Sequence, residues 1–157
     1  MRQKRLHGIA VALLCAAAIF LSLWPGRAAA REVDSAAASA IVMEAQNGTV
    51  LLSHDAETER PMASTTKIMT ALLALENGQL DELVTASERA FGVPGTSIYL
   101  SAGETLTLHD MLYGLMLASG NDAAVAIAEH IGGTVEEFCA RMTARARELG
   151  CMHTVFL

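Results

Sequence analysis

The feature that most constrains the fold is a helical segment, residues 64–76, that is apolar on nearly every face. Its body has the sequence IMTALLAL (residues 68–75), and Asn77-Gly78 follows, a typical helix stop. A helix that is apolar all round is buried on all sides. We therefore expect the other elements of the chain to surround it.

Two strands are expected before this helix, at residues 39–45 and 49–54. They flank Asn47-Gly48, and Asn-Gly between β-rich segments is a strong hairpin signal. Two strands alone do not form a stable sheet. After residue 60 the sequence offers only short strand candidates, such as residues 98–100, so the domain is expected to be incomplete.

The second half of the chain is expected to be helical. Each of three segments begins at a residue type that caps helices and is followed by glycine or a connector. The expected helices are residues 108–117 (capped by Thr107 with Asp110), 122–131 (capped by Asn121) and 135–149 (capped by Thr134 with Glu137).

The first 30 residues have the plan of a secretory signal peptide. Basic residues precede an apolar segment, residues 9–24, and Ala28-Ala29-Ala30 offers a cleavage site after Ala30. The alternative is a membrane anchor, but sixteen helical residues span roughly 24 Å, less than a hydrocarbon core of about 30 Å. We expect export to the extracytoplasmic cell envelope.

The remaining residues, 31–157, are strongly acidic. They hold all 17 acidic residues of the chain and seven basic ones. Such a charge balance argues against binding to nucleic acid or to anionic lipid. The chain is also 52% apolar and 18% charged, which excludes a disordered tail.

Export permits disulfides, but Cys139 and Cys151 are expected to be buried free thiols. They lie at the two ends of one expected helix. Twelve helical residues separate them by roughly 18 Å, whereas a disulfide needs Cα atoms within about 7 Å.

The strongest candidate for chemistry is Ser64 with Lys67. Lys67 is the one lysine of residues 31–157, and positions three apart share a helix face, so the hydroxyl and the amine can meet. A serine needs a base to become a nucleophile, and a lysine serves as that base only when its surroundings lower its pKa. The alternative is a helix-capping serine beside a surface lysine.

A second candidate is Ser119-Gly120-Asn121, between two expected helices. It offers a hydroxyl and an amide on a rigid junction. By itself it is better interpreted as structural, because Asn is a common helix cap and Ser a common connector residue. The four histidines of residues 31–157 show no metal-binding spacing, and no phosphate-binding glycine loop follows a strand. We expect neither a metal nor a cofactor.

The order S-x-x-K then S-x-N resembles the first two motifs of penicillin-binding proteins and serine β-lactamases. The sequence around these motifs is similar to that of the low-molecular-weight D-alanyl-D-alanine carboxypeptidases. The similar segments are residues 61–76 (PMASTTKIMTALLALE), 97–108 (SIYLSAGETLTL) and 110–131 (DMLYGLMLASGNDAAVAIAEHI). The resemblance implies a mixed, three-layer α/β fold of the transpeptidase type, here as its N-terminal hairpin and helical lobe.

The resemblance also implies a two-step acyl transfer on the peptidoglycan stem pentapeptide. Ser64 would attack the carbonyl between the terminal D-alanines, Lys67 would take its proton, and Ser119 would pass a proton to the departing D-alanine. Asn121 would hold the Lys67 amine and the substrate amide. β-Lactam antibiotics would acylate Ser64 as covalent inhibitors.

One departure from the family is clear: its third motif, K-T-G, does not occur in the 157 residues. We therefore interpret residues 31–157 as the N-terminal part of the catalytic domain, truncated before K-T-G and inactive alone. Membrane contact would come only through an uncleaved signal or a missing C-terminal anchor. The alternatives are a serine β-lactamase and a non-catalytic module of penicillin-binding-protein type.

Overall fold

In the computed structural model, which describes residues 31–32 and 36–157, the Asn47-Gly48 turn produces the predicted hairpin. The chain divides into two compact units between Arg60 and Pro61. The expected signal peptide, residues 1–30, lies outside the described residues. Within the described ranges, no helix is both long enough and apolar enough to cross a membrane.

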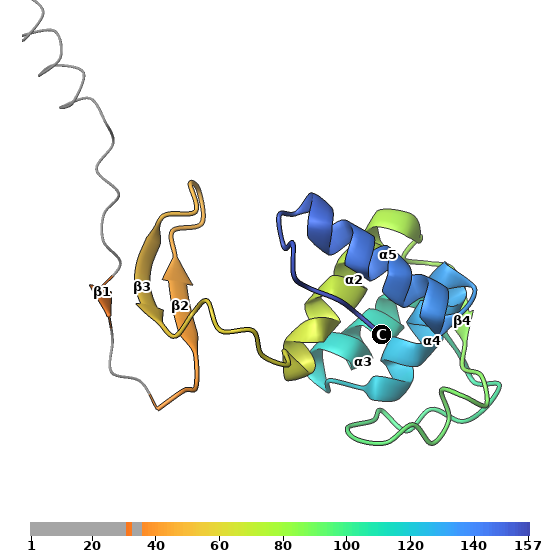
Figure 1. Cartoon of the computed structure of the whole chain (residues 1–157). Coiled ribbons are helices and arrows are strands. Elements are labelled where there is room, and N and C mark those ends of the chain that lie inside the picture. Colours follow the sequence, from red (N-terminus) through yellow and green to blue (C-terminus); the bar gives the residue numbers. More distant parts are fainter. Residues whose placement is uncertain (1–30, 33–35) are drawn as a thin grey trace, which may run out of the picture. The chain divides into compact units, whose positions relative to one another are not determined.

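The first unit carries a small sheet with strand order β1-β3-β2 (Figure 1). Strands β2 (Ala40–Met43) and β3 (Val50–His54) are antiparallel, and β1 (Arg31–Glu32) pairs in parallel with β3. Gly48 has φ +72°, a conformation that glycine adopts without strain. Apolar side chains are about half exposed on this unit: Ile41, Val42, Met43 and Leu51.

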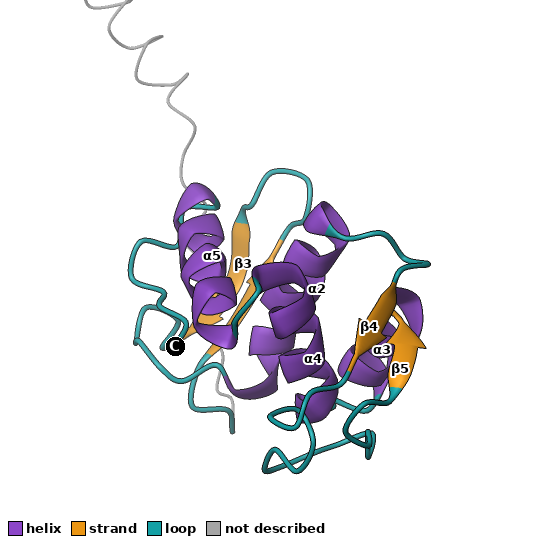
Figure 2. Ribbon diagram, turned by 90° about the vertical axis from the view of Figure 1, so that its right-hand side faces the viewer, coloured by secondary structure: helices purple, strands orange, loops and turns teal. Residues whose placement is uncertain are grey.

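The second unit is built around helix α4 (Asn121–Gly132), which packs against α2 (Thr66–Asn77), α3 (Leu108–Leu117) and α5 (Val135–Glu148) (Figure 2). The face of α4 toward its neighbours carries small residues, with Ala123, Ala126 and Ala128 buried. Small side chains let helix backbones approach closely, so one short helix can contact three others.

The predicted caps of α3 and α5 are confirmed. The Thr107 hydroxyl accepts a hydrogen bond from the Asp110 N–H (3.1 Å), and the Thr134 hydroxyl accepts one from the Glu137 N–H (3.1 Å). Each supplies an acceptor to an N–H that has no partner within its helix.

Helix α2 departs from its prediction in two ways. It follows a separate 3₁₀ turn, η1 (Ala63–Thr65), and it is not buried on all sides. Leu73 and Ala74 are in the core, but Ile68 and Leu75 are 60% and 57% exposed. The expectation of all-round burial was wrong for this structure, because the neighbours that pack on α2 cover only part of its surface.

The segment between α2 and α3 also differs from the prediction. It contains an antiparallel pair, β4 (Leu83–Thr85) and β5 (Thr105–Thr107), which we did not predict. The expected strand at residues 98–100 is absent, since these residues form a loop in which Tyr99 has φ +64°. A left-handed residue in the middle breaks the extended backbone that a strand needs.

The two cysteines are free thiols, as expected. The expectation that both are buried was wrong: Cys139 is half-buried and Cys151 is exposed. Cys151 lies just beyond the end of α5, where its N–H donates to the carbonyl of Ala146 (2.9 Å), so it closes the helix rather than filling the core.

Candidate active site

Ser64 lies in the η1 turn directly before α2, with an exposed side chain. The preceding residue, Ala63, has φ +48°, in the left-handed region that costs a residue with a Cβ atom about 1–2 kcal/mol. The turn is tied back by the Thr65 hydroxyl, which donates to the carbonyl of Met62 (2.6 Å). The result is a hydroxyl that stands at the entry of the helix, open to an incoming molecule.

Ser119 lies between α3 and α4 and contacts Ser64 directly. Its hydroxyl donates a hydrogen bond to the Ser64 hydroxyl oxygen (3.1 Å), across 55 positions of sequence. Ser119 has φ +56°, so this residue is also held in a left-handed conformation. The two serines predicted as site residues are therefore brought together by the fold.

Gly120, between Ser119 and Asn121, is buried, and its neighbours leave no room for a side chain. A Cβ atom here would lie 2.9 Å from Asp122 Oδ1 and 3.3 Å from the carbonyl oxygen of Gly114. The Gly120 N–H donates to that same carbonyl (3.1 Å). The close approach sets the path of the chain from Ser119 into α4.

Lys67 lies one helical turn after Ser64 and is half-buried. Its Nζ donates a hydrogen bond to Asn121 Oδ1 (2.7 Å). Among the described residues, no hydrogen bond joins Lys67 Nζ to Ser64, whose hydroxyl bonds to Ser119 instead. The four predicted site residues thus form two hydrogen-bonded pairs that share the start of α2 and the start of α4.

Asn121 does not cap α4, contrary to the prediction. The N-cap is Gly120, and α4 begins at Asn121 itself. The Asn121 side chain instead bridges two elements: Oδ1 accepts from Lys67, and Nδ2 donates to the carbonyl of Pro94 (2.7 Å). The Asn121 amide, which local sequence rules assign to helix capping, therefore makes hydrogen bonds to residues distant in the sequence.

Strained backbone gathers around these residues. Four non-glycine residues of the described chain have positive φ, and three of them lie in the second unit: Ala63, Tyr99 and Ser119. Ala63 precedes Ser64, Ser119 contacts it, and Tyr99 lies on the loop that touches Asn121. Such strain persists where the surrounding structure enforces it, and it clusters at functional sites.

Sequence reasoning missed the buried acid that follows Asn121. Asp122 is 1% exposed and accepts hydrogen bonds from the loop of residues 97–100. Its one signal in the sequence is an acid directly before the apolar stretch AAVAIA, residues 123–128. That signal is weak, because acids are common in the first turn of any helix.

Within residues 31–32 and 36–157, no group of three or more His, Cys, Asp or Glu side chains is placed to hold a metal ion. The four site residues supply two hydroxyls, an amine and an amide. An exposed serine with a second hydroxyl donating to it, and an amine one turn away, is an arrangement suited to nucleophilic attack and proton transfer.

Comparison with known proteins identifies relatives over most of the chain. The model of the S11 peptidase family, described as D-alanyl-D-alanine carboxypeptidase, matches residues 26–157. The D-alanyl-D-alanine carboxypeptidase DacF of Bacillus subtilis is 42% identical over 130 residues, which are 80% of this chain and 33% of DacF. A D-alanyl-D-alanine carboxypeptidase of Streptomyces is 38% identical over 133 residues, 77% of this chain and 46% of that protein.

Solved structures show the same fold. A D-alanyl-D-alanine carboxypeptidase of Mycobacterium tuberculosis superimposes with a TM-score of 0.73 at 33% identity, covering 80% of this chain and 47% of that one. A DD-transpeptidase of Streptomyces gives a TM-score of 0.74 at 35% identity, covering 79% and 52%. The expected mixed α/β fold of the penicillin-binding protein type is confirmed.

The chain spans about a third to a half of the length of the curated relatives it matches. The match covers every helix and strand of the described residues, and it includes both pairs of hydrogen-bonded site residues. The chain belongs to the S11 peptidase family of D-alanyl-D-alanine carboxypeptidases.

Proposed function

We propose that the protein is a serine-type D-alanyl-D-alanine carboxypeptidase that removes the terminal D-alanine from peptidoglycan stem peptides. The observation that carries this proposal is the hydrogen bond between Ser119 and Ser64. It joins the S-x-x-K segment at the start of α2 to the S-x-N segment at the start of α4. Membership of the S11 family adds the reaction class.

In the proposed first step, Ser64 Oγ attacks the carbonyl carbon between the two terminal D-alanines, and its proton passes to the Lys67 amine. The C–N bond then breaks, the departing D-alanine takes a proton by way of the Ser119 hydroxyl, and an ester remains on Ser64. Water hydrolyses that ester and regenerates the serine. Asn121 holds the Lys67 amine through its Oδ1 atom.

The same chemistry predicts that β-lactam antibiotics acylate Ser64 as covalent inhibitors. We place the enzyme in the extracytoplasmic cell envelope, since the stem peptides of the wall are there and residues 1–30 have the plan of an export signal. We also propose that residues 31–157 are the N-terminal part of the catalytic domain. The share of the relatives' length that the chain spans supports this assignment.

The test is covalent labelling of the full-length protein with a fluorescent penicillin, followed by mass spectrometry of the labelled peptide. We expect one label, on Ser64, and none in Ser64→Ala. Ser101→Ala is the matched control, an exposed serine on a neighbouring loop, and it should label like the wild type. Labelling that persists in Ser64→Ala would reject the nucleophile assignment.

A second assay separates the carboxypeptidase from its alternatives. The full-length protein should release D-alanine from a peptide that ends in D-Ala-D-Ala and should hold penicillin as a long-lived ester. Rapid penicillin hydrolysis without D-alanine release would indicate a β-lactamase. Binding of the wall peptide without turnover or labelling would indicate a non-catalytic module.

A further inference from the structure

Asp122 is the most fully buried charged side chain near the candidate active site, and the proposed reaction assigns it no role. We infer that Asp122 is a positioning residue: it fixes the loop of residues 94–100 against the start of α4, and through that loop it orients the Asn121 amide toward Lys67. Its effect on catalysis rests on the function proposed above, whereas its effect on the loop does not.

The Asp122 carboxylate is the acceptor for several donors at once. Its hydrogen bonds come from the Ser97 hydroxyl (2.6 Å), the Leu100 N–H (3.0 Å), the Ile98 N–H (3.1 Å to each oxygen) and the Ala123 N–H (2.9 Å). Burial by itself would raise the pKa of Asp122, but these hydrogen bonds lower it. The group is therefore a buried carboxylate held in its charged form.

An acidic side chain in the first turn of a helix ordinarily stabilises that helix, through its dipole and its free N–H groups. Asp122 accepts more hydrogen bonds from the loop than from its own helix. Among the described residues that donate to it, Ala123 belongs to α4, while Ser97, Ile98 and Leu100 belong to the loop. Local helix capping does not account for that distribution.

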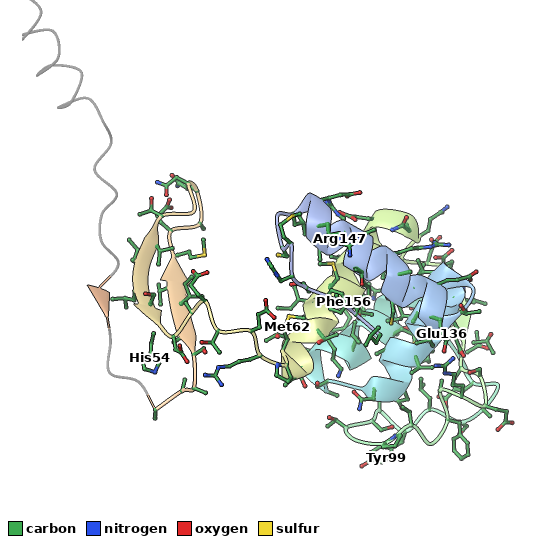
Figure 3. The ribbon with its side chains drawn as sticks, viewed as in Figure 1. His54, Met62, Tyr99, Glu136, Arg147 and Phe156 are labelled. Carbon is green, nitrogen blue, oxygen red and sulfur yellow. The ribbon has the colours of Figure 1, made fainter. Side chains whose placement is uncertain are left out.

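Tyr99 explains how two loop N–H groups reach the same carboxylate. Its φ of +64° turns the backbone between Ile98 and Leu100, so that both N–H groups point to one side, as in the backbone concavities that bind anions. The Tyr99 side chain is 88% exposed and points out from the loop (Figure 3). Burial of the ring therefore does not offset the backbone strain at Tyr99. The hydrogen bonds from Ile98 and Leu100 to Asp122 offset it.

The other end of the loop contacts Asn121. The Asn121 N–H donates to the carbonyl of Thr96 (2.7 Å), and Asn121 Nδ2 donates to the carbonyl of Pro94 (2.7 Å). A carbonyl oxygen only accepts, so the amide nitrogen of Asn121 must face Pro94. Asn121 Oδ1 is then left to face Lys67 Nζ (2.7 Å). The position of the loop therefore orients the Asn121 amide so that its oxygen, Oδ1, accepts the hydrogen bond from Lys67.

The test variant is Asp122→Asn in the full-length protein. Whichever way the new amide is turned, its NH₂ group faces a backbone N–H, of Leu100 or of Ala123. One hydrogen bond is therefore replaced by a donor–donor contact, and the negative charge that the loop donors face is lost. We expect the rate of acylation by fluorescent penicillin to fall about 10²-fold, the effect of a misplaced group near the reacting atoms. Asp110→Asn is the matched control, since Asp110 is also an acid in the first turn of its helix, and it should leave the rate unchanged.

A double-mutant cycle with Asn121→Ala separates positioning from general stability. If Asp122 acts through Asn121, Asp122→Asn causes little further loss of acylation in the Asn121→Ala background. Ser97→Ala keeps the charge but removes one donor to Asp122 and the acceptor of the Tyr99 N–H (2.8 Å). It should show the same dependence at smaller amplitude, and it serves if Asp122→Asn does not fold. Equal losses in both backgrounds, or a near wild-type rate in Asp122→Asn, would overturn the inference.

Hydrogen exchange without penicillin provides a measurement that does not depend on the reaction. In Asp122→Asn, the Ile98 and Leu100 amides and the Asn121 side-chain amide should exchange faster, while amides in α5 keep the wild-type rate. If the wild type is not acylated, the proposed function fails, and this exchange pattern still decides the role of Asp122. Unchanged exchange at Asn121 would reject it.

Discussion

A substitution at Gly95 tests the link between the loop and the active site without changing any proposed catalytic residue. Gly95 has φ +102°, and a Cβ atom on it would lie 2.5 Å from Asn121 Nδ2 and 3.7 Å from Asn121 Cγ. In Gly95→Ala the amide must move, and it is held on one side by Pro94 and on the other by Lys67. The new methyl group therefore acts on the hydrogen bonds of Asn121.

The size of the effect follows from three contributions. Positive φ at a residue with a Cβ atom costs about 1–2 kcal/mol. Loss of the neutral bond from Asn121 to Pro94 costs about 1 kcal/mol, and loss of the charged bond from Lys67 costs about 1.5 kcal/mol for a half-buried group. We expect Gly95→Ala to lower the free energy of unfolding by about 3.5–4.5 kcal/mol.

Gly92→Ala is the matched control. Gly92 also has positive φ, +77°, but a Cβ atom there meets nothing within 4 Å. It should therefore lose only the backbone contribution, about 1–2 kcal/mol. The difference between the two variants, about 2.5 kcal/mol, isolates the contact with Asn121.

Both variants would be measured in the full-length protein by urea unfolding and by the rate of acylation with fluorescent penicillin. Gly95→Ala should be the less stable of the two and should lose about 10²-fold in acylation, whereas Gly92→Ala should acylate like the wild type. If the two variants match in stability and in rate, the loop does not hold the Asn121 amide, and the reasoning is refuted.

Three further predictions concern Lys67 as the general base, the loss of stability at acidic pH, and the purified chain of residues 1–157. Lys67→Arg keeps the positive charge but should lose acylation, because a guanidinium does not deprotonate at working pH; an arginine variant with a near wild-type rate would leave Lys67 as an electrostatic partner. Burial would raise the pKa of Asp122, but its hydrogen bonds lower the pKa below the ordinary value of 3.8. The stabilisation from this carboxylate is therefore complete above pH 3.8 and is lost as the pH falls through the lowered pKa. The unfolding temperature should therefore fall less steeply at acidic pH in Asp122→Asn than in the wild type. Purified chain 1–157 should release no measurable D-alanine and should be poorly soluble, because K-T-G is absent from it and apolar residues of the hairpin, such as Ile41 and Leu51, are half exposed; D-alanine release by the monomeric chain would contradict this.

Several elements followed from the sequence because their causes lie within a few residues. The Asn47-Gly48 turn determines the hairpin, since glycine takes the positive φ that the turn requires. Thr107 and Thr134 determine where α3 and α5 begin, since each hydroxyl binds an N–H three residues on. In such cases the interacting groups are neighbours in the chain, and no other part of the molecule is needed.

The candidate site was predictable in its members but not in its geometry. The spacing of Ser64 and Lys67 predicted a shared helix face, and the structure puts them one turn apart. That spacing did not predict that Ser64 bonds to Ser119, and the contact of Lys67 with Asn121 was expected only from the family resemblance. These partners are more than fifty positions apart, so their meeting depends on how α2 and α4 pack.

The remaining differences have the same origin. Residues 98–100 have strand-forming side chains, yet the Ile98 and Leu100 N–H groups donate to the buried carboxylate of Asp122, and Tyr99 between them has a left-handed backbone. Asn121 has the chemistry of a helix cap, yet Lys67 and Pro94 take its amide. The sequence by itself determined the hairpin turn, the caps of α3 and α5 and the chemical groups of the site. Only the tertiary structure decided which groups meet, because a hydrogen bond between distant residues forms where packing brings a donor and an acceptor together.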